Sequence, residues 1–188
     1  MAESLTAITT GIGRFSYLHV FEARSITEGS PAKYSVSFLI PKGDKKTIDK
    51  IKAAEAEAIK QGLAKKWNGK KPKDLKSILK DGDDEDGDNA KIYAGHYFIS
   101  CNASQEDQPK VVDMAMKPLG KGEVKSGDYG RIHVNIYPFA SDANKGVAVY
   151  LKFLQKYKDG ESLEGGIDID DAFSDDVEDF NEDADSDF

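Results

Sequence analysis

The stretch RIHVNIYPFASDANKGVAVYLKFLQKY, residues 131–157, decides the fold because it contains two long strands joined by a hairpin turn. In its first half, Ile132, Val134 and Ile136 alternate with more polar residues, and a period of two is typical of a strand with one buried face. The turn SDANKG supplies Asn and Gly, the residues that tight hairpin turns favour. After the turn the alternation resumes, with Val147, Val149, Leu151 and Phe153 on one side of the second strand.

The same period of two occurs upstream of this hairpin and predicts further strands at residues 9–24, 33–42, 93–103 and 110–118. After the second of these strands the period changes to that of a helix over residues 44–67, with Asp44 or Thr47 as the N-cap. Residues 67–90 then form a long excursion, in which one short helical turn is expected at residues 75–79.

This order of about six strands and one main helix predicts a mainly β protein, an OB-fold-like small barrel with a long inserted excursion. In an OB-fold the helix commonly lies between strands three and four. Here the helix is expected directly after strand two, so the barrel must have a displaced or inserted helix.

Charge is distributed unevenly along the chain. Residues 159–188 contain 14 of the 34 acidic residues and none of the 26 Lys and Arg residues, so residues 1–158 carry a net charge of +6. Without the acidic segment DGDDEDGD, residues 81–88, this body carries +12. The asymmetry predicts a polyanion-binding domain at residues 1–158 and an acidic interaction tail at residues 159–188, which we expect to be disordered because few of its residues are apolar. A solvated surface with a solubilising tail is the alternative.

No motif for catalysis or cofactor binding is found. Residues 81–88 do not fit an EF-hand, because neither end of such a loop would supply a carboxylate. The three histidines, His19, His96 and His133, are far apart and lack the spacing of a zinc site. We therefore expect no catalytic residue, no metal and no cofactor.

Cysteine content and hydropathy bear on the location of the protein. Cys101 is the single cysteine, so no internal disulfide is possible, and its apolar surroundings predict a buried side chain. Neither a signal peptide nor an apolar run of membrane-spanning length is found, which predicts a cytoplasmic protein without a membrane partner.

Aromatic and basic residues share the polar face of three predicted strands. A protein that holds single-stranded nucleic acid needs flat side chains that stack on bases and cations that follow the phosphates. For each ring alone a core position is the alternative, but for the whole set on a basic body the pattern favours DNA contact. The predicted DNA-binding residues are Arg14, Phe15, Tyr17, His19, Phe21, Arg131, His133, Tyr137, Phe139, Tyr150 and Lys152.

Several segments resemble a family of bacteriophage single-stranded-DNA-binding proteins. They are KKWNGKKP (residues 65–72), LKDGDDE (79–85), YAGHYFISCNAS (93–104), KVVD (110–113) and SGDYGRIHVNIYPF (126–139), which continues into NKGVAVYL. Gly130 stands where a larger residue would be expected. The resemblance implies an OB-fold-like core that coats single-stranded DNA during phage replication and recombination. It also implies that the acidic tail recruits partners.

The last residues of the tail combine acids with an aromatic ring. We expect Asp185, Asp187 and Phe188 to bind a replication or recombination protein, such as a polymerase, helicase or recombinase. The negative charge of the tail is also expected to compete with DNA for the basic body.

Two other functions fit the same composition. The chain could be a recombination mediator or annealing protein that acts mainly through protein partners and touches DNA weakly. It could also be a DNA mimic, in which residues 81–88 and the tail occupy the basic groove of another protein. A non-catalytic single-stranded-DNA-binding protein is the leading hypothesis, and salt-sensitive binding to oligothymidine would distinguish it from the others.

Overall fold

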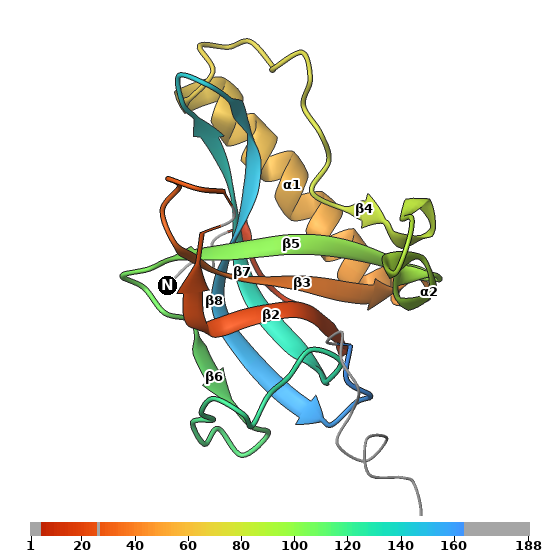
Figure 1. The fold of residues 1–188 in the computed structure, drawn as a ribbon. Coiled ribbons are helices and arrows are strands. Elements are labelled where there is room, and N and C mark those ends of the chain that lie inside the picture. Colours follow the sequence, from red (N-terminus) through yellow and green to blue (C-terminus); the bar gives the residue numbers. More distant parts are fainter. Residues whose placement is uncertain (1–4, 26, 164–188) are drawn as a thin grey trace, which may run out of the picture.

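The computed structural model of the protein describes residues 5–25 and 27–163 and contains one eight-stranded sheet (Figure 1). As predicted, the protein is mainly β with one main helix. The strands are β1 (Ala7–Thr9), β2 (Gly13–Arg24), β3 (Lys33–Pro41), β4 (Lys80–Asp81), β5 (His96–Ser104), β6 (Lys110–Val112), β7 (Tyr129–Ala140) and β8 (Lys145–Lys158). The helices are α1 (Lys45–Lys65), the short α2 (Asn89–Tyr93) and the 3₁₀ turn η1 (Gly82–Asp84).

Five of the strands close into a barrel of OB-fold type. β2 pairs with β3, β3 with β5, β5 with β8, β8 with β7, and β7 returns to β2. Only the pairing of β5 with β8 is parallel in this ring, which gives a Greek-key order. The helix α1 follows β3, the second barrel strand, so the predicted displacement of the helix is confirmed.

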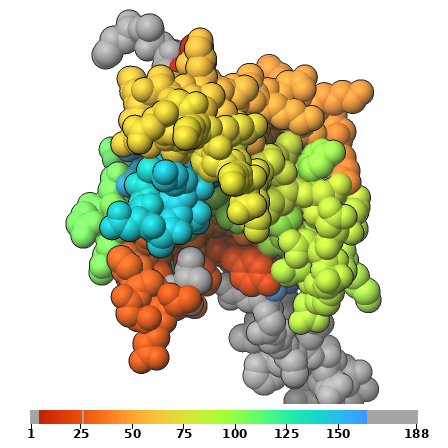
Figure 2. All heavy atoms as spheres, turned by 90° about the horizontal axis from the view of Figure 1, so that it is seen from above, coloured from red at the N-terminus to blue at the C-terminus, as the bar shows by residue number. Residues whose placement is uncertain are grey.

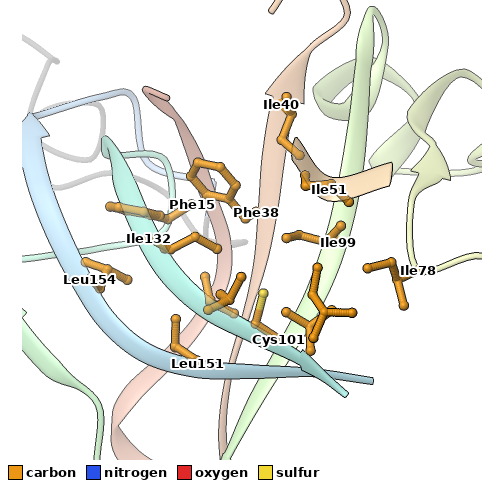
Figure 3. Close-up of a cluster of buried hydrophobic side chains, with 14 of the residues drawn as sticks. Phe15, Phe38, Ile40, Ile51, Ile78, Ile99, Cys101, Ile132, Leu151 and Leu154 are labelled. Carbon is orange, nitrogen blue, oxygen red and sulfur yellow. The ribbon is translucent and has the colours of Figure 1, made fainter. Parts of the chain in front are cut away.

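The barrel interior is filled by apolar side chains from every barrel strand, as Figure 3 shows. Phe15, Phe38, Ile99, Ile132 and Leu151 are fully or almost fully buried there. The expected alternation produces this core, since every second residue of β3, β5 and β7 points inward. Cys101 is buried among them, as expected from its apolar surroundings.

The helix α1 packs mainly against β7 and covers the barrel with a buried face made of Thr47, Ile48, Ile51, Ala54, Ala58 and Gly62. Its N-cap is Asp44, whose carboxylate accepts a hydrogen bond from the Thr47 backbone N–H at 3.2 Å. Just beyond its C-terminal end, the ring of Trp67 lies over Gly62 and its Nε1 donates to the Phe139 carbonyl at 3.1 Å. This bond joins the start of the excursion to the β7–β8 hairpin.

A bulge in β2 reverses the alternation that the sequence predicts for residues 15–21. Phe15 pairs with Phe38, His19 pairs with Ser35, and the register shifts between Ser16 and His19. Within the bulge Tyr17 has a φ of 48°, in the left-handed region. The inward positions are therefore odd-numbered before the bulge and even-numbered after it.

The excursion also differs from the prediction. Residues 75–79 form no helical turn, and the helical turns lie instead at η1 and α2. The acidic segment at residues 81–88 is partly built into the fold, because Asp81 and Asp83 pair with Lys42 at 2.7 and 2.5 Å. Asp83 also accepts a hydrogen bond from the Gly95 N–H at 2.9 Å.

Barrel closure requires glycine at the seam between β2 and β7, where Gly13 and Gly130 face each other. A Cβ atom on Gly130 would lie 2.0 Å from the Gln155 carbonyl oxygen and 2.6 Å from Cζ of Phe15. Backbone and a core ring occupy this space, which explains why no larger residue stands there.

We predict that Gly130→Ala lowers the free energy of unfolding by about 1–3 kcal/mol or more, the usual cost of overpacking. Gly43→Ala is the matched control, because a Cβ there meets nothing within 4 Å. Urea titrations of both variants followed by circular dichroism check the prediction. Equal midpoints for the two variants would contradict the account of the seam.

Candidate nucleic-acid interface

The outer face of β3 and β5 is a floor of small polar side chains. Ser35 pairs with Asn102 and Ser37 with Ser100, so these four residues share one face of the sheet. Their neighbours Val36, Phe38, Ile99 and Cys101 point into the core. Because the floor residues are short, a ligand can approach the sheet closely.

Aromatic side chains stand on both sides of this floor. One cross-strand row runs from His19 through Ser35 and Asn102 to Tyr150, with each pair in direct register. Tyr150 in turn forms an edge-to-face pair with Tyr137, at 6.5 Å between ring centroids. We call the floor with these flanking residues the β3–β5 groove.

One end of the groove widens into a cavity of about 470 Å³ with lysines on its walls. Lys76 and Lys80 come from the excursion, Phe139 and Lys145 from the β7–β8 hairpin, and Ser100 from the floor. In Figure 2 the hairpin (cyan) and the excursion (yellow) lie side by side, and the loop between β2 and β3 (orange, lower left) lies across a hollow from the excursion. In OB-folds, this face and the two corresponding loops are the usual oligonucleotide-binding surface.

The other end of the groove has a second cavity of about 590 Å³, lined by Tyr17, His19, Arg24 and Leu163 among others. Tyr17 is 53% exposed, and its hydroxyl donates to Oδ1 of Asn89 at 2.9 Å. The bulge that displaces Tyr17 thus turns its ring outward beside the floor.

The groove collects six of the residues predicted to bind DNA from the sequence. Lys152 reaches it from β8, with its Nζ 4.8 Å from the Tyr150 ring centroid and 3.6 Å from Asp107. The six residues around the groove are Tyr17, His19, Tyr137, Phe139, Tyr150 and Lys152.

Three predicted residues of β2 lie elsewhere. Phe15 has no exposed surface, so the prediction that its ring contacts DNA is wrong, and the bulge is the reason. Phe21 is half-buried against the core and borders a different cleft, with Val124. The Arg14 guanidinium donates to the carbonyls of Gly127 and Glu161 and stacks on Tyr129.

Arg131 and His133 lie on a separate surface, together with Phe153. A register shift in the β7–β8 pair, between His133 and Val134, turns Phe153 outward, so the prediction that it shares one side of the strand with Val149 and Leu151 is wrong and its side chain is 48% exposed. These three residues, with Thr9, Lys110, Val112, Met116 and Gln155, form what we call the Met116 patch.

The sequence-based prediction missed the floor itself and the lysines at its end. Ser35, Ser37, Ser100 and Asn102 alternate with apolar residues in the sequence, so the signal that found the core could also have found them. Lys76, Lys80 and Lys145 reach the groove only through the path of the excursion and the hairpin, which no periodicity encodes.

The residues just after β8 are fixed against the barrel by a buried carboxylate. Asp128 accepts hydrogen bonds from Lys125 Nζ at 2.8 Å and from the Gly160 N–H at 3.0 Å, and it lies 3.3 Å from Lys156 Nζ. The Leu163 N–H donates to the Ser126 carbonyl at 3.0 Å. Contacts with the barrel thus continue to Leu163, beyond the domain boundary expected at residue 158.

The tail residues predicted to bind a partner, metal ligands and membrane spans are not part of this site. Asp185, Asp187 and Phe188 lie outside the described residues. Within residues 5–25 and 27–163, His, Cys, Asp and Glu form no cluster that could hold a metal ion. No helix in this part of the chain is long and apolar enough to cross a membrane.

Comparison with known proteins places this architecture in a family. The family model for the single-stranded-DNA-binding protein of Enterobacter phage Enc34 matches residues 6–187. The chain belongs to this family. Protein p50 of Acyrthosiphon pisum secondary endosymbiont phage 1 is 31% identical over 167 residues, which are 81% of this chain and 84% of p50.

Solved structures share the fold of this family member. The Enc34 protein in complex with single-stranded DNA superposes with a TM-score of 0.68 at 24% identity, over 85% of this chain and 90% of that one. The single-stranded-DNA-binding protein gp2.5 of bacteriophage T7 has a TM-score of 0.60 at 16% identity, over 92% of this chain and 96% of gp2.5.

The Asp128 carboxylate gives a pH-dependent prediction. Burial alone would raise the pKa of Asp128, but the hydrogen bonds from Lys125, Gly160 and Lys156 outweigh it and hold the pKa below its ordinary value. A lowered pKa stabilises the fold above the unfolded-state value of about 3.9, and the stabilisation is lost as the pH falls through the folded-state value. Asp128→Asn should therefore cost about 1–3 kcal/mol at pH 7.

Thermal unfolding from pH 7 to pH 3 checks this prediction, with Asp142→Asn in the exposed hairpin turn as control. The difference in melting temperature between the native chain and Asp128→Asn should become smaller at the acid end of the series. A difference in melting temperature that stays constant with pH would mean that the carboxylate charge does not hold the residues after β8 against the barrel.

Proposed function

We propose that this protein binds single-stranded DNA in the β3–β5 groove and coats it, without catalysis, during phage replication and recombination. The observation that carries the proposal is the groove itself, in which a short polar floor lies between aromatic rings and ends among lysines. The complex of the Enc34 protein with single-stranded DNA, a member of the same family, supports the choice of ligand.

The groove suits a single strand better than a duplex. Unpaired bases can enter the shallow floor and stack on Tyr17, Tyr137 and Tyr150, a contact that every base can make. Lys80 and Lys145 at the widened end would follow the phosphates, with affinity that falls as salt rises. Ser and Asn side chains can donate hydrogen bonds to any base or accept them from it, so little sequence preference is expected.

The acidic tail is proposed to compete with DNA for the same groove. The Asp128 contacts hold Leu163 in the cavity that contains Tyr17 and His19, so residues 164–188 start at one end of the groove. Their negative charge mimics a nucleic-acid backbone, and the short connection raises their local concentration. Bound DNA would displace the tail and free Asp185, Asp187 and Phe188 to recruit a polymerase, helicase or recombinase.

We predict that Tyr137→Ala weakens binding to fluorescent oligothymidine about fivefold or more, because base stacking contributes about 1–3 kcal/mol. Tyr157→Ala is the matched control, since this tyrosine is also exposed on the surface but lines no part of the groove. Fluorescence anisotropy at fixed salt measures both variants. If both variants lose affinity equally, or if neither loses affinity, the groove is not the binding surface.

Deletion of residues 164–188 should tighten binding to the same oligonucleotide, most clearly at low salt, because the internal competitor is gone. The deletion keeps residues 159–163, which belong to the folded body. Phe188→Ala should leave DNA affinity nearly unchanged and abolish co-purification of the phage polymerase, helicase or recombinase. Unchanged affinity after the deletion would rule out competition, and retention of every partner by Phe188→Ala would rule out recruitment through this ring.

A further inference from the structure

Exposed apolar side chains gather around the Met116 patch, which lies away from the β3–β5 groove. Met114, Met116, Phe153 and Tyr157 are each between 48 and 63% exposed, and all come from the turn after β6 or the second half of β8. These two segments lie together at the lower left of the barrel in Figure 1. The patch encloses about 530 Å³, and such exposed apolar hollows mark interaction sites.

The patch has a defined geometry. Lys110 pairs with Phe153, Phe153 with His133 and His133 with Thr9, so one cross-strand row forms its floor. The rings of His133 and Phe153 lie 5.7 Å apart between centroids.

The turn that carries Met116 is held in place by Asp113, whose Oδ1 accepts from the N–H groups of Ala115 and Lys117 at 2.8 and 3.0 Å. Met116 has a φ of 64°, and its sulfur lies 3.7 Å from Nε2 of Gln155. The fold therefore presents this methionine over the floor in a fixed direction.

Charge indicates a ligand other than a continuing DNA strand. The carboxylate of Asp107 lies at the β8 side of the groove, where it accepts from the Tyr150 hydroxyl at 2.8 Å and pairs with Lys152. This negative charge would repel a phosphate backbone that left the groove along β8. Among the described residues that line the patch, Lys110 and Arg131 are cationic and none is acidic. An apolar ring with carboxylates on either side fits this surface.

The chain itself carries such a segment outside the described residues. DAFSDDVEDF, residues 171–180, contains two phenylalanines and five acidic residues. Nine residues lie between Leu163 and Phe173, so their Cα atoms can be up to about 35 Å apart when the chain is extended. The chain leaves β8 beside the patch, because Lys156, which pairs with Asp159, directly follows Gln155 of the patch.

We propose that residues 171–180 dock on the Met116 patch of the same molecule, with Phe173 or Phe180 inserted against Met116 and Phe153. The flanking carboxylates then pair with Lys110 and Arg131. Residues 164–170 and 181–188 stay outside this contact, so their acidic residues remain available to the β3–β5 groove and Phe188 remains available to other proteins.

A spin-label experiment on the full chain tests the docking. Cys101 is buried, and burial raises the pKa of its thiol, so a cysteine introduced by Ser174→Cys is labelled selectively with a nitroxide. Met116 is one of three methionines and is observed through its ¹³C-methyl signal, assigned with Met116→Leu. The label at position 174 should broaden this signal, and a label placed by Ser186→Cys should broaden it much less.

Phe173→Ala with Phe180→Ala should lower the docked population about tenfold or more, because burial of a phenylalanine ring contributes that much affinity. Phe188→Ala is the matched control and should leave the broadening intact. Equal broadening from both label positions, or broadening that survives the double change, overturns the proposal.

Contact within one molecule is distinguished from contact between two by mixing two kinds of chain. One kind carries the nitroxide but no ¹³C, and the other carries ¹³C-methionine but no nitroxide. Broadening in this mixture would assign the docking to a second copy and overturn the intramolecular form. The samples contain no nucleic acid, so the result is separate from that of the oligonucleotide titrations.

Discussion

The close approach of β2 and β7 at Gly13 and Gly130 is the constraint on which the barrel depends. Without this contact the five strands would form an open sheet, and Phe15 and Ile132 would not share one interior. Closure leaves only the outer face of the sheet and the loops at its ends for recognition. The β3–β5 groove uses this outer face, and its depth follows from the short side chains that the outward positions carry.

Two of the register shifts, the one at Tyr17 and the one after His133, decide which aromatic rings are available on the surface. The bulge at Tyr17 sends Phe15 inward and leaves Tyr17 and His19 beside the floor. The shift after His133 does the opposite for Phe153, which leaves the core and becomes part of the Met116 patch. Bulges commonly re-aim side chains at binding sites, and here each one changes the chemistry of a separate surface.

The sequence was sufficient to predict the fold class, the main helix and its place after the second barrel strand, because these follow from periodicity and from the Asp44 cap. It also predicted the aromatic flanks contributed by Tyr137 and Tyr150, whose strands keep their alternation up to the hairpin. The buried or exposed side of Phe15 and Phe153 could not be predicted. One extra residue in a strand means that positions before and after it no longer share the same alternation, and nothing in the sequence marks where it occurs. The approach of Lys76 and Lys80 to the groove depends on long-range packing of the excursion.

The hydrogen bond from Trp67 to Phe139 joins the base of the excursion to the tip of the β7–β8 hairpin. The two walls at the widened end of the groove are thus tied at one point, and separating them there would break this partly buried hydrogen bond. The width of the opening is therefore set before any ligand arrives. On binding, the DNA strand would lose most of the conformational entropy. The preformed opening would increase affinity, because the protein itself would lose little.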